Sequence, residues 1–210
     1  MVHIDSKTIG ESKQLLADEV FHHIGRLITE GELGDGERIR DVDVAEELHV
    51  SRTPVREALQ RLERLGLVTM YPSRYTEVTA VTAAVVSQSL EFAGYQAGVS
   101  ARMAVPRLTP AERQQVAQLI ADLHDSLDDG ASISSARWAV FAYLADHSGN
   151  HQHRMLIDDV DVALSRNLRA WVVPRRDRER MGQIYRDFGD AVQRGDGDEA
   201  ERLARAMYYV

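Results

Sequence analysis

Hydrophobic residues in the first third of the chain recur mostly at helical spacing, interrupted by short polar connections. The spacing predicts a helix over about residues 12–30, which the Gly- and Asp-rich segment 31–36 ends. A short helix follows around 44–48, and a tight connection leads to a further helix that begins near residue 51. Two short helices joined by a three- or four-residue turn form a helix-turn-helix. The apolar positions of the first helix are Leu16, Val20, Ile24, Leu27 and Ile28.

The segment Ser51–Leu62 has the most informative pattern in the chain. It combines an apolar stripe at helical spacing with three arginines, Arg52, Arg56 and Arg61. Such a helix can bury one face and present another to DNA. An ordinary amphipathic surface helix would have the same pattern, so the neighbouring segments have to decide between the two interpretations.

Capping and turn residues set the bounds of this helix. Ser51 is suited to the N-cap, Pro54 is tolerated in the first turn, and Gly66 is suited to the position after the helix. Residues 67–71 and 75–79 then read as the two strands of a hairpin. A helix, a helix-turn-helix and a hairpin together make a winged helix, in which the second short helix enters the major groove of DNA.

Residues 13–80 resemble the DNA-binding domain of the GntR-family bacterial repressors. The family's signature Ser-Arg-Thr-Pro-Val-Arg-Glu-Ala-Leu…Gly-Leu-Val is present at Ser51–Val68 almost letter for letter. The resemblance implies that the start of the arginine helix and the wing tip contact a double-stranded DNA operator. The residues implied are Ser51, Arg52, Thr53, Arg56, Ser73 and Arg74. The chain departs from the family where Arg74-Tyr75 replaces a frequent wing glycine, and the helix before the turn is unusually acidic.

The net charge of −8 is unexpected for a protein that binds DNA. Residues 1–80 alone contain 10 lysines and arginines against 15 aspartates and glutamates. Residues 51–65, however, contain four arginines and only two glutamates, so this segment is locally basic. Because physiological salt screens charges beyond roughly 8–10 Å, this local basic face matters more than distant acids.

Helical periodicity replaces the strand pattern from about residue 82. We expect a mainly α protein, with a winged helix-turn-helix in residues 1–80 and an all-α antiparallel helical bundle in residues 81–210. A bundle of this size can hold a ligand cavity between its helices. The six helices predicted are 82–104, 109–127, 134–147, 150–171, 175–193 and 198–209.

The bundle resembles the helical effector domain of the FadR-type branch of the GntR family, called FCD-like. Its landmarks are Phe141–Asn150, similar to the family's F-H-x-x-L-A-x-x-S-G-N, and Ala191–Ala200, similar to A-[IL]-x-x-G-D…A. Six helices match the shorter VanR-like group. The resemblance implies effector binding and dimerisation by this domain.

Many members of this branch bind a divalent metal through an aspartate and three histidines. Those positions fall in this chain at Trp138, Ala142, Tyr185, and Met207 or Tyr208, of which the first three offer no suitable donor. An arginine that binds effector carboxylates in relatives falls near Ala93. We therefore expect no metal and no cofactor, and a pocket suited to an aromatic or largely apolar effector. The pocket residues expected are Trp138, Ala142, Tyr185, Met207 and Arg102.

A substitute metal site is the alternative interpretation of three nearby histidines, His147, His151 and His153, with Asp158 and Asp159 close in sequence. His147 and His151 are four residues apart, but Ser148-Gly149 lies between them. If that pair ends one helix before the next begins, the two histidines do not share a helical face, and solvated or capping roles are favoured.

The sequence as a whole indicates a cytoplasmic, homodimeric transcriptional regulator, most simply a repressor whose operator affinity a small molecule changes. No apolar run approaches the length of a membrane span, no signal-peptide pattern opens the chain, and the absence of cysteine excludes disulfides and thiolate chemistry. A regulator that responds to no ligand is the main alternative. An enzymatic helical domain is a remote one, because no nucleophile or phosphate-binding motif is present.

Overall fold

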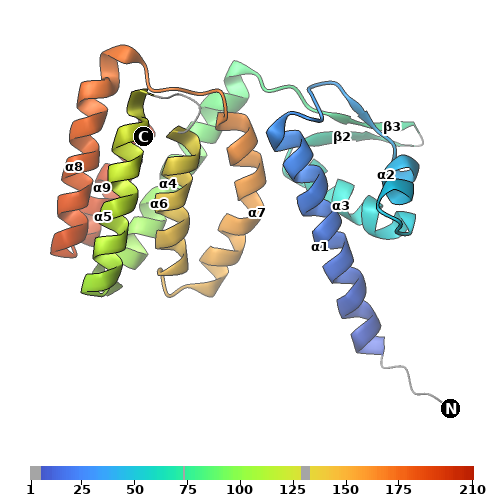
Figure 1. Ribbon diagram of the computed structural model, residues 1–210, viewed down its shortest axis with the longest axis horizontal. Coiled ribbons are helices and arrows are strands. Elements are labelled where there is room, and N and C mark those ends of the chain that lie inside the picture. Colours follow the sequence, from blue (N-terminus) through green and yellow to red (C-terminus); the bar gives the residue numbers. More distant parts are fainter. Residues whose placement is uncertain (1–5, 73, 129–132) are drawn as a thin grey trace. The chain divides into compact units, whose positions relative to one another are not determined.

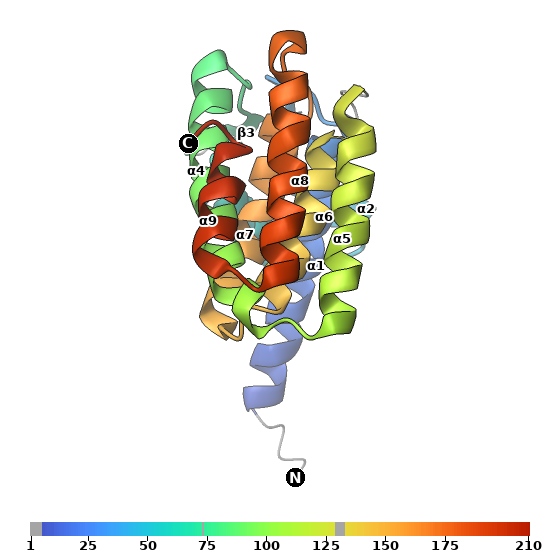
Figure 2. The same cartoon turned by 90° about the vertical axis from the view of Figure 1, so that its left-hand side faces the viewer.

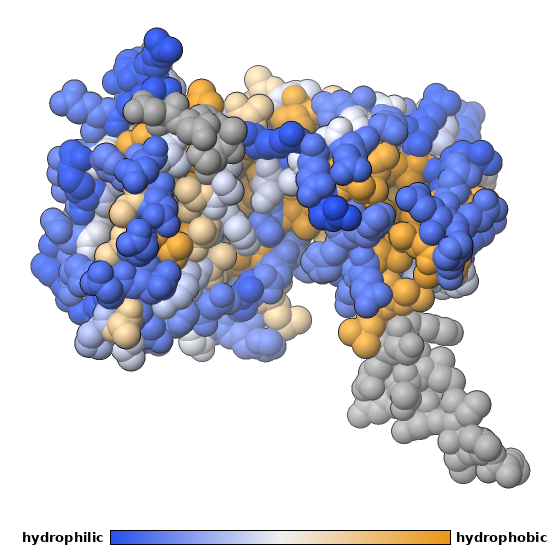
Figure 3. All heavy atoms as spheres, viewed as in Figure 1, coloured by the Kyte–Doolittle hydropathy of each residue, from blue (hydrophilic) through white to orange (hydrophobic). Residues whose placement is uncertain are grey.

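The computed structural model describes residues 6–72, 74–128 and 133–210 and is drawn in Figure 1. The chain divides into two compact units, Met1–Val81 and Thr82–Val210, each with its own hydrophobic core. In the space-filling view of Figure 3, hydrophilic residues cover most of the visible face of each unit, and within each unit hydrophobic residues show in the gaps among the hydrophilic ones. The mainly α architecture predicted from the sequence is confirmed.

The N-terminal unit is a winged helix-turn-helix. Its small sheet is antiparallel, with the strand order β1-β3-β2, and the β2–β3 hairpin forms the wing. The sequence did not predict β1, because two residues are too few to show a strand period. The elements are α1 (Ser6–Glu30), β1 (Arg38–Ile39), α2 (Asp41–Glu47), α3 (Arg52–Arg64), β2 (Val68–Tyr71) and β3 (Tyr75–Val78).

The core of this unit lies mainly between α1 and α3. The apolar stripes that defined both helices in the sequence are buried there, which fixes the side of α3 that faces away from the core. Gly66 has a φ of +74° directly after α3, a left-handed conformation that favours glycine and turns the chain into β2. The buried side chains include Val20, Phe21, Ile24, Val55, Leu59 and Leu62.

Residues 82–128 and 133–210, the described part of the C-terminal unit, form six α-helices, the number that the sequence predicted. Figure 2 shows them lying side by side as a bundle. Thr109 begins the second helix with a capping box, since it accepts a hydrogen bond from Glu112 N while the Glu112 side chain accepts one from Thr109 N. The helices are α4 (Ala83–Ala104), α5 (Pro110–Asp125), α6 (Ile133–Asp146), α7 (His151–Leu168), α8 (Arg178–Arg194) and α9 (Gly197–Ala206).

Two glycines let α4 approach α9 and the chain end closely. A Cβ added to Gly94 would lie 2.9 Å from Tyr208 Cβ, and one added to Gly98 would lie 2.8 Å from Arg205 Cγ. Both distances are shorter than side-chain contacts allow. The close approach places the segment after α9, with Met207 and Tyr208, inside the bundle core.

Candidate nucleic-acid interface and ligand cavity

The first half of α3 exposes the residues expected to contact DNA. Arg52, Thr53 and Arg56 are all exposed, whereas Pro54 and Val55 between them are buried. Ser51 occupies the N-cap position with extended backbone angles, but its side chain makes no capping hydrogen bond. The capping role expected for the Ser51 hydroxyl is therefore not seen, and this exposed side chain lies beside the arginines.

A carboxylate at the start of α2 holds both of these arginines. Asp41 Oδ2 accepts a hydrogen bond from Arg52 Nη2 at 2.9 Å and lies 3.7 Å from Arg56 Nε. The Asp41 side chain is 23% exposed, while those of Arg52 and Arg56 are 59% and 63% exposed. Exposed pairs of this kind are worth only about 0–1 kcal/mol, so the guanidinium groups can exchange the carboxylate for another acceptor.

The wing lies beside this half of α3. A cleft of about 550 Å³ separates the two, and its lining includes Arg52, Arg56 and the exposed Arg74. Arg74 N donates to Tyr71 O at 3.0 Å, which closes the turn of the hairpin. Ser73, the other wing residue expected to contact DNA, lies outside the described residues.

The third arginine of the motif has a structural role. Arg61 Nη1 donates to Asp18 Oδ1 of α1 at 2.7 Å, and its guanidinium carbon lies 4.0 Å from the centre of the Phe21 ring. Nine residues separate Arg61 from Arg52, which at 3.6 residues per turn places it on roughly the opposite side of the helix. Helical phase therefore distinguishes Arg61 from Arg52 and Arg56, a distinction that counting arginines misses.

The C-terminal unit contains a small cavity between its helices, of about 30 Å³. Of the residues expected in an effector pocket, Trp138 is part of the lining of this cavity. Tyr185 and Met207 are instead fully buried in the core, and Ala142 is half-buried away from the cavity lining. The cavity is lined by Ala93, Ser134, Arg137, Trp138, Leu164, Ser165, Leu168, Trp171 and Tyr208.

The placement of Arg102 in the pocket has to be corrected. Its side chain is 50% exposed and forms an ion pair with Asp198, next to the start of α9. Arg102 lies on the outer side of α4, where water solvates the charge, while Ala93, Ala97 and Ala101 form the buried side.

Arg137 is the charged residue that lines this cavity, and the sequence analysis did not place it there. It is only 2% exposed, and its Nε and Nη2 donate to Tyr185 Oη at 3.3 and 3.1 Å. Burial raises the pKa of Tyr185, and the positive charge of Arg137 opposes that rise. The phenol is therefore neutral near pH 7 and acts as a hydrogen-bond acceptor for the guanidinium.

The residues at the positions where relatives bind metal do not fit a metal ion. Indole, methyl and thioether groups at Trp138, Ala142 and Met207 are not the imidazole and carboxylate donors that divalent metals prefer, and the phenol of Tyr185 is engaged by Arg137. Across residues 6–72, 74–128 and 133–210, no group of three or more His, Asp or Glu side chains is placed to hold a metal.

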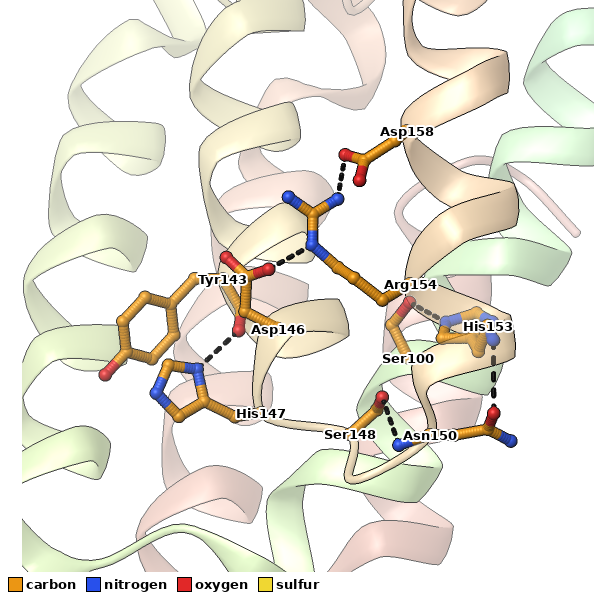
Figure 4. A network of polar contacts seen from close by, with 9 residues as sticks. All are labelled: Ser100, Tyr143, Asp146, His147, Ser148, Asn150, His153, Arg154 and Asp158. Atoms are coloured by element: carbon orange, nitrogen blue, oxygen red, sulfur yellow. Dashed lines mark hydrogen bonds and ion pairs between the residues drawn. The ribbon is translucent and has the colours of Figure 1, made fainter. Parts of the chain in front are cut away.

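The three histidines considered as a substitute metal site do not converge, as Figure 4 shows for two of them. The predicted helix break is confirmed, since α6 ends at Asp146 and α7 begins at His151. His147 Nδ1 donates to Tyr143 O at 2.7 Å, and its ring stacks on that of Tyr143. His153 faces α4 instead.

His153 is buried, and its Nε2 lies 2.8 Å from Ser100 Oγ. The Ser100 hydroxyl donates its single proton to Gln96 O at 2.9 Å, so His153 Nε2 carries a proton and donates to Ser100. Burial lowers the pKa of His153, which keeps the ring neutral near pH 7.

The landmark Ser148-Gly149-Asn150 forms the turn between α6 and α7. Gly149 has a φ of +70°, and Asn150 Oδ1 caps α7 by accepting from His153 N at 3.1 Å. Arg154 then joins the two helices through ion pairs with Asp146 and Asp158 (Figure 4). This part of the resemblance therefore reflects helix capping and packing.

None of the described helices is both long and apolar enough to cross a membrane.

Comparison with protein families matches both units. The model of the bacterial regulatory proteins of the gntR family matches residues 16–78, and that of the FCD domain matches residues 98–209. The chain is 27% identical over 197 residues to the HTH-type transcriptional regulator LutR of Bacillus subtilis, covering 83% of this chain and 90% of LutR. It is 26% identical over 191 residues to an uncharacterized HTH-type transcriptional regulator of Mycobacterium tuberculosis, covering 89% and 75% of the two chains.

Solved structures agree in fold. McbR/YncC of E. coli aligns with a TM-score of 0.69 at 21% identity, over 92% of this chain and 93% of that one. A GntR transcriptional regulator of Rhodococcus sp. RHA1 aligns with a TM-score of 0.62 at 20% identity, over 91% and 93%.

Proposed function

Because the chain belongs to the GntR family of bacterial regulatory proteins and carries an FCD domain, we propose that it is a repressor that binds a short pseudo-palindromic operator as a homodimer. Proteins of this family are transcriptional regulators that bind DNA, not enzymes. The repressor acts in the cytoplasm, where bacterial DNA lies, and a small molecule bound by the helical unit changes its affinity for the operator.

The exposure of Arg52 and Arg56 on one side of α3, beside the wing, carries the proposal. An arginine at the start of a recognition helix can donate two hydrogen bonds to O6 and N7 of a guanine in the major groove. Thr53, exposed between them, can contact a base or a phosphate. Arg74 on the wing contacts the backbone or the minor groove, which positions the unit without reading sequence.

We propose a homodimer because one recognition helix alone contacts too few base pairs to define a specific operator. One short helix contacts only a few base pairs, and two copies related by a two-fold axis double the site and require a pseudo-palindrome. The net charge of the whole chain is −8, which opposes binding to DNA in general. Affinity therefore depends strongly on the contacts that only the correct site provides.

The effector acts by changing the relative populations of two arrangements of the dimer that differ in operator affinity. A ligand changes operator affinity only by as much as it prefers one arrangement of the dimer over another. One observation favours a regulator that responds to no ligand, because Tyr185 and Met207 fill the bundle and leave about 30 Å³ of cavity. A ligand that occupies this cavity as it stands must be small.

Selection from a pool of random duplexes by the purified full-length chain tests the proposal. We expect enrichment of a sequence with two inverted half-sites, protected in a footprint by two protomers per duplex. Sedimentation of the protein–DNA complex gives that stoichiometry. Binding by a single protomer to an asymmetric site would refute the dimer, and no enrichment over the starting pool would refute sequence-specific binding.

A further inference from the structure

Glu63, in the last turn of α3, links this helix to the wing. Its Oε1 accepts a hydrogen bond from Met70 N of β2 at 2.8 Å, and both residues line the cleft between α3 and the wing. Because β2 is an edge strand in the order β1-β3-β2, alternate N–H groups of this strand point away from β3. The Glu63 carboxylate supplies the acceptor that the edge of the sheet lacks at Met70.

A carboxylate at this position is otherwise unfavourable. The C-terminal end of a helix carries a partial negative charge, and Glu63 lies in the last turn of α3. The cleft that it lines also contains Arg52, Arg56 and Arg74, the residues expected to face the phosphates and bases of DNA. Among the side chains that the structure describes, no basic group forms an ion pair with Glu63. The hydrogen bond from Met70 is therefore the contact that accounts for a glutamate here.

Side-chain contacts stiffen the hairpin between Met70 and its tip. Tyr71 and Tyr75 are opposite each other in the β2–β3 register, and their ring centres lie 4.8 Å apart. The guanidinium carbon of Arg38 on β1 lies 3.9 Å from the centre of the Tyr75 ring. Cross-strand aromatic pairs and cation–π contacts of this kind stabilise a hairpin beyond its backbone hydrogen bonds. A displacement of Met70 therefore moves Arg74 with it instead of being absorbed within the hairpin.

We propose that Glu63 is a positioning residue for DNA binding, and that its hydrogen bond with Met70 sets the distance of the wing from α3. This distance determines whether Arg74 reaches the DNA while Arg52 lies in the major groove. Glu63 contacts neither base nor phosphate and acts through Arg74. The proposal rests on the DNA-binding function proposed above and defines how the two contact elements of that site are held in register.

Variants that change side-chain length and charge separately test this role. Glu63→Asp keeps the charge, but its side chain is one methylene shorter and no longer reaches Met70 N in its present place. Glu63→Gln removes the charge and keeps a carbonyl oxygen at the same reach. Glu57→Gln is the matched control, because it removes an exposed charge from the same helix. Fluorescence anisotropy of labelled selected and scrambled duplexes gives the affinity of each full-length protein over a range of salt concentrations.

We expect Glu63→Asp to bind both duplexes about threefold to tenfold more weakly than wild type, the size of one lost hydrogen bond. The slope of log K against log salt should fall by about one unit, because Arg74 no longer reaches its phosphate. Glu63→Gln should keep the wild-type slope and bind as tightly as Glu57→Gln. In an Arg74→Ala protein, adding Glu63→Asp should have no further effect, because both changes remove the same contact. A role confined to stability would change the melting temperature and leave the slope unchanged.

Additive losses in the double variant would overturn the proposal, as would a wild-type slope in Glu63→Asp or an equal loss in Glu63→Gln. Glu63→Ala, which offers Met70 N no acceptor at all, should reproduce the slope of Glu63→Asp and covers the case that the shorter carboxylate still reaches this group.

The dependence of Glu63 on Arg74 is measurable on the scrambled duplex alone, which separates this inference from the proposed function. A selected duplex whose binding requires Arg52 but not Glu63 would retain the regulatory function and refute the inference. If selection enriched no sequence while the two residues remained coupled on the scrambled duplex, the operator would be refuted and the positioning role retained.

Discussion

The carboxylate of Asp41 lies 2.9 Å from the Nη2 atom of Arg52, so a residue of α2 holds an arginine of the recognition helix when no DNA is bound. The same oxygen lies 3.7 Å from Arg56 Nε. This contact orients two flexible side chains toward one region of the surface. It also places a negative charge where a phosphate would otherwise be attracted.

Replacing Asp41 by Asn should therefore reduce the discrimination between DNA sequences. Without the charge, we expect tighter binding to unrelated duplexes, and the less ordered arginines should gain less from the correct bases. The ratio of dissociation constants for the selected and a scrambled duplex, measured at fixed salt, tests this. Asp43→Asn is the matched control, because Asp43 lies on the same helix but pairs with Arg40. An unchanged ratio in Asp41→Asn would contradict this role for Asp41.

The wing arginine should contribute affinity without sequence information. If Arg74 contacts phosphate, Arg74→Ala should weaken binding to all duplexes by a similar factor and reduce the slope of log K against log salt by about one unit. Salt titrations of both duplexes measure the slope. Arg26→Ala, which removes an exposed arginine of α1 paired with Glu30, should leave the slope unchanged. Loss confined to the selected duplex would mean that Arg74 reads bases.

Arg61 should matter for stability and not for sequence recognition. Arg61→Ala removes the 2.7 Å contact with Asp18 and the cation–π contact with Phe21, which together are worth about 1 kcal/mol. Faster hydrogen exchange of the α1 and α3 amides would report that loss. Arg64→Ala, an exposed arginine at the end of the same helix, is the control. If Arg61→Ala changed base preference as Arg52→Ala does, the assignment of Arg61 to the core side would fail.

His153 should make the stability of the helical unit depend on pH. Burial holds its pKa in the folded state below the ordinary value of 6.5, so the unfolded state binds more protons under mildly acidic conditions. The stabilising contribution is complete above pH 6.5 and is lost as the pH falls through the lower folded pKa. Urea unfolding followed by tryptophan fluorescence at several pH values measures the effect.

Substituting His153 by Gln should flatten this pH dependence, because the amide can still donate to Ser100 Oγ but does not titrate. His151→Gln, which changes an exposed histidine on the same helix, should leave the wild-type profile unchanged. Equal pH profiles for wild type and His153→Gln would show that another group titrates.

Much of the fold could be predicted because local signals agreed with the final packing. The residues Thr109-Pro110 marked a helix start that the capping box confirms, and the apolar stripes of α1 and α3 marked the faces that pack. Strand β1 could not be predicted. Its two residues are fixed by pairing with Thr76 and Glu77 of β3, which are distant in sequence.

The two sites differed in how far the sequence could define them. Exposure of Arg52 and Arg56 follows from helical phase, but the contact with Asp41 depends on how α2 packs on α3. An arginine in a helix is usually solvated, so nothing in the sequence distinguished the buried Arg137 from the exposed Arg102. Only the packing of α6 against the end of the chain reveals which of the two is buried.

The most direct test compares wild type and Arg52→Ala on the selected duplex and on a scrambled duplex at the same salt concentration. Arg52→Ala should lose about 1–3 kcal/mol of binding free energy on the selected duplex, with relaxed preference at one base pair of each half-site and little change on the scrambled duplex. Equal affinities of the two proteins for the selected duplex would contradict the assignment of α3 as the recognition helix.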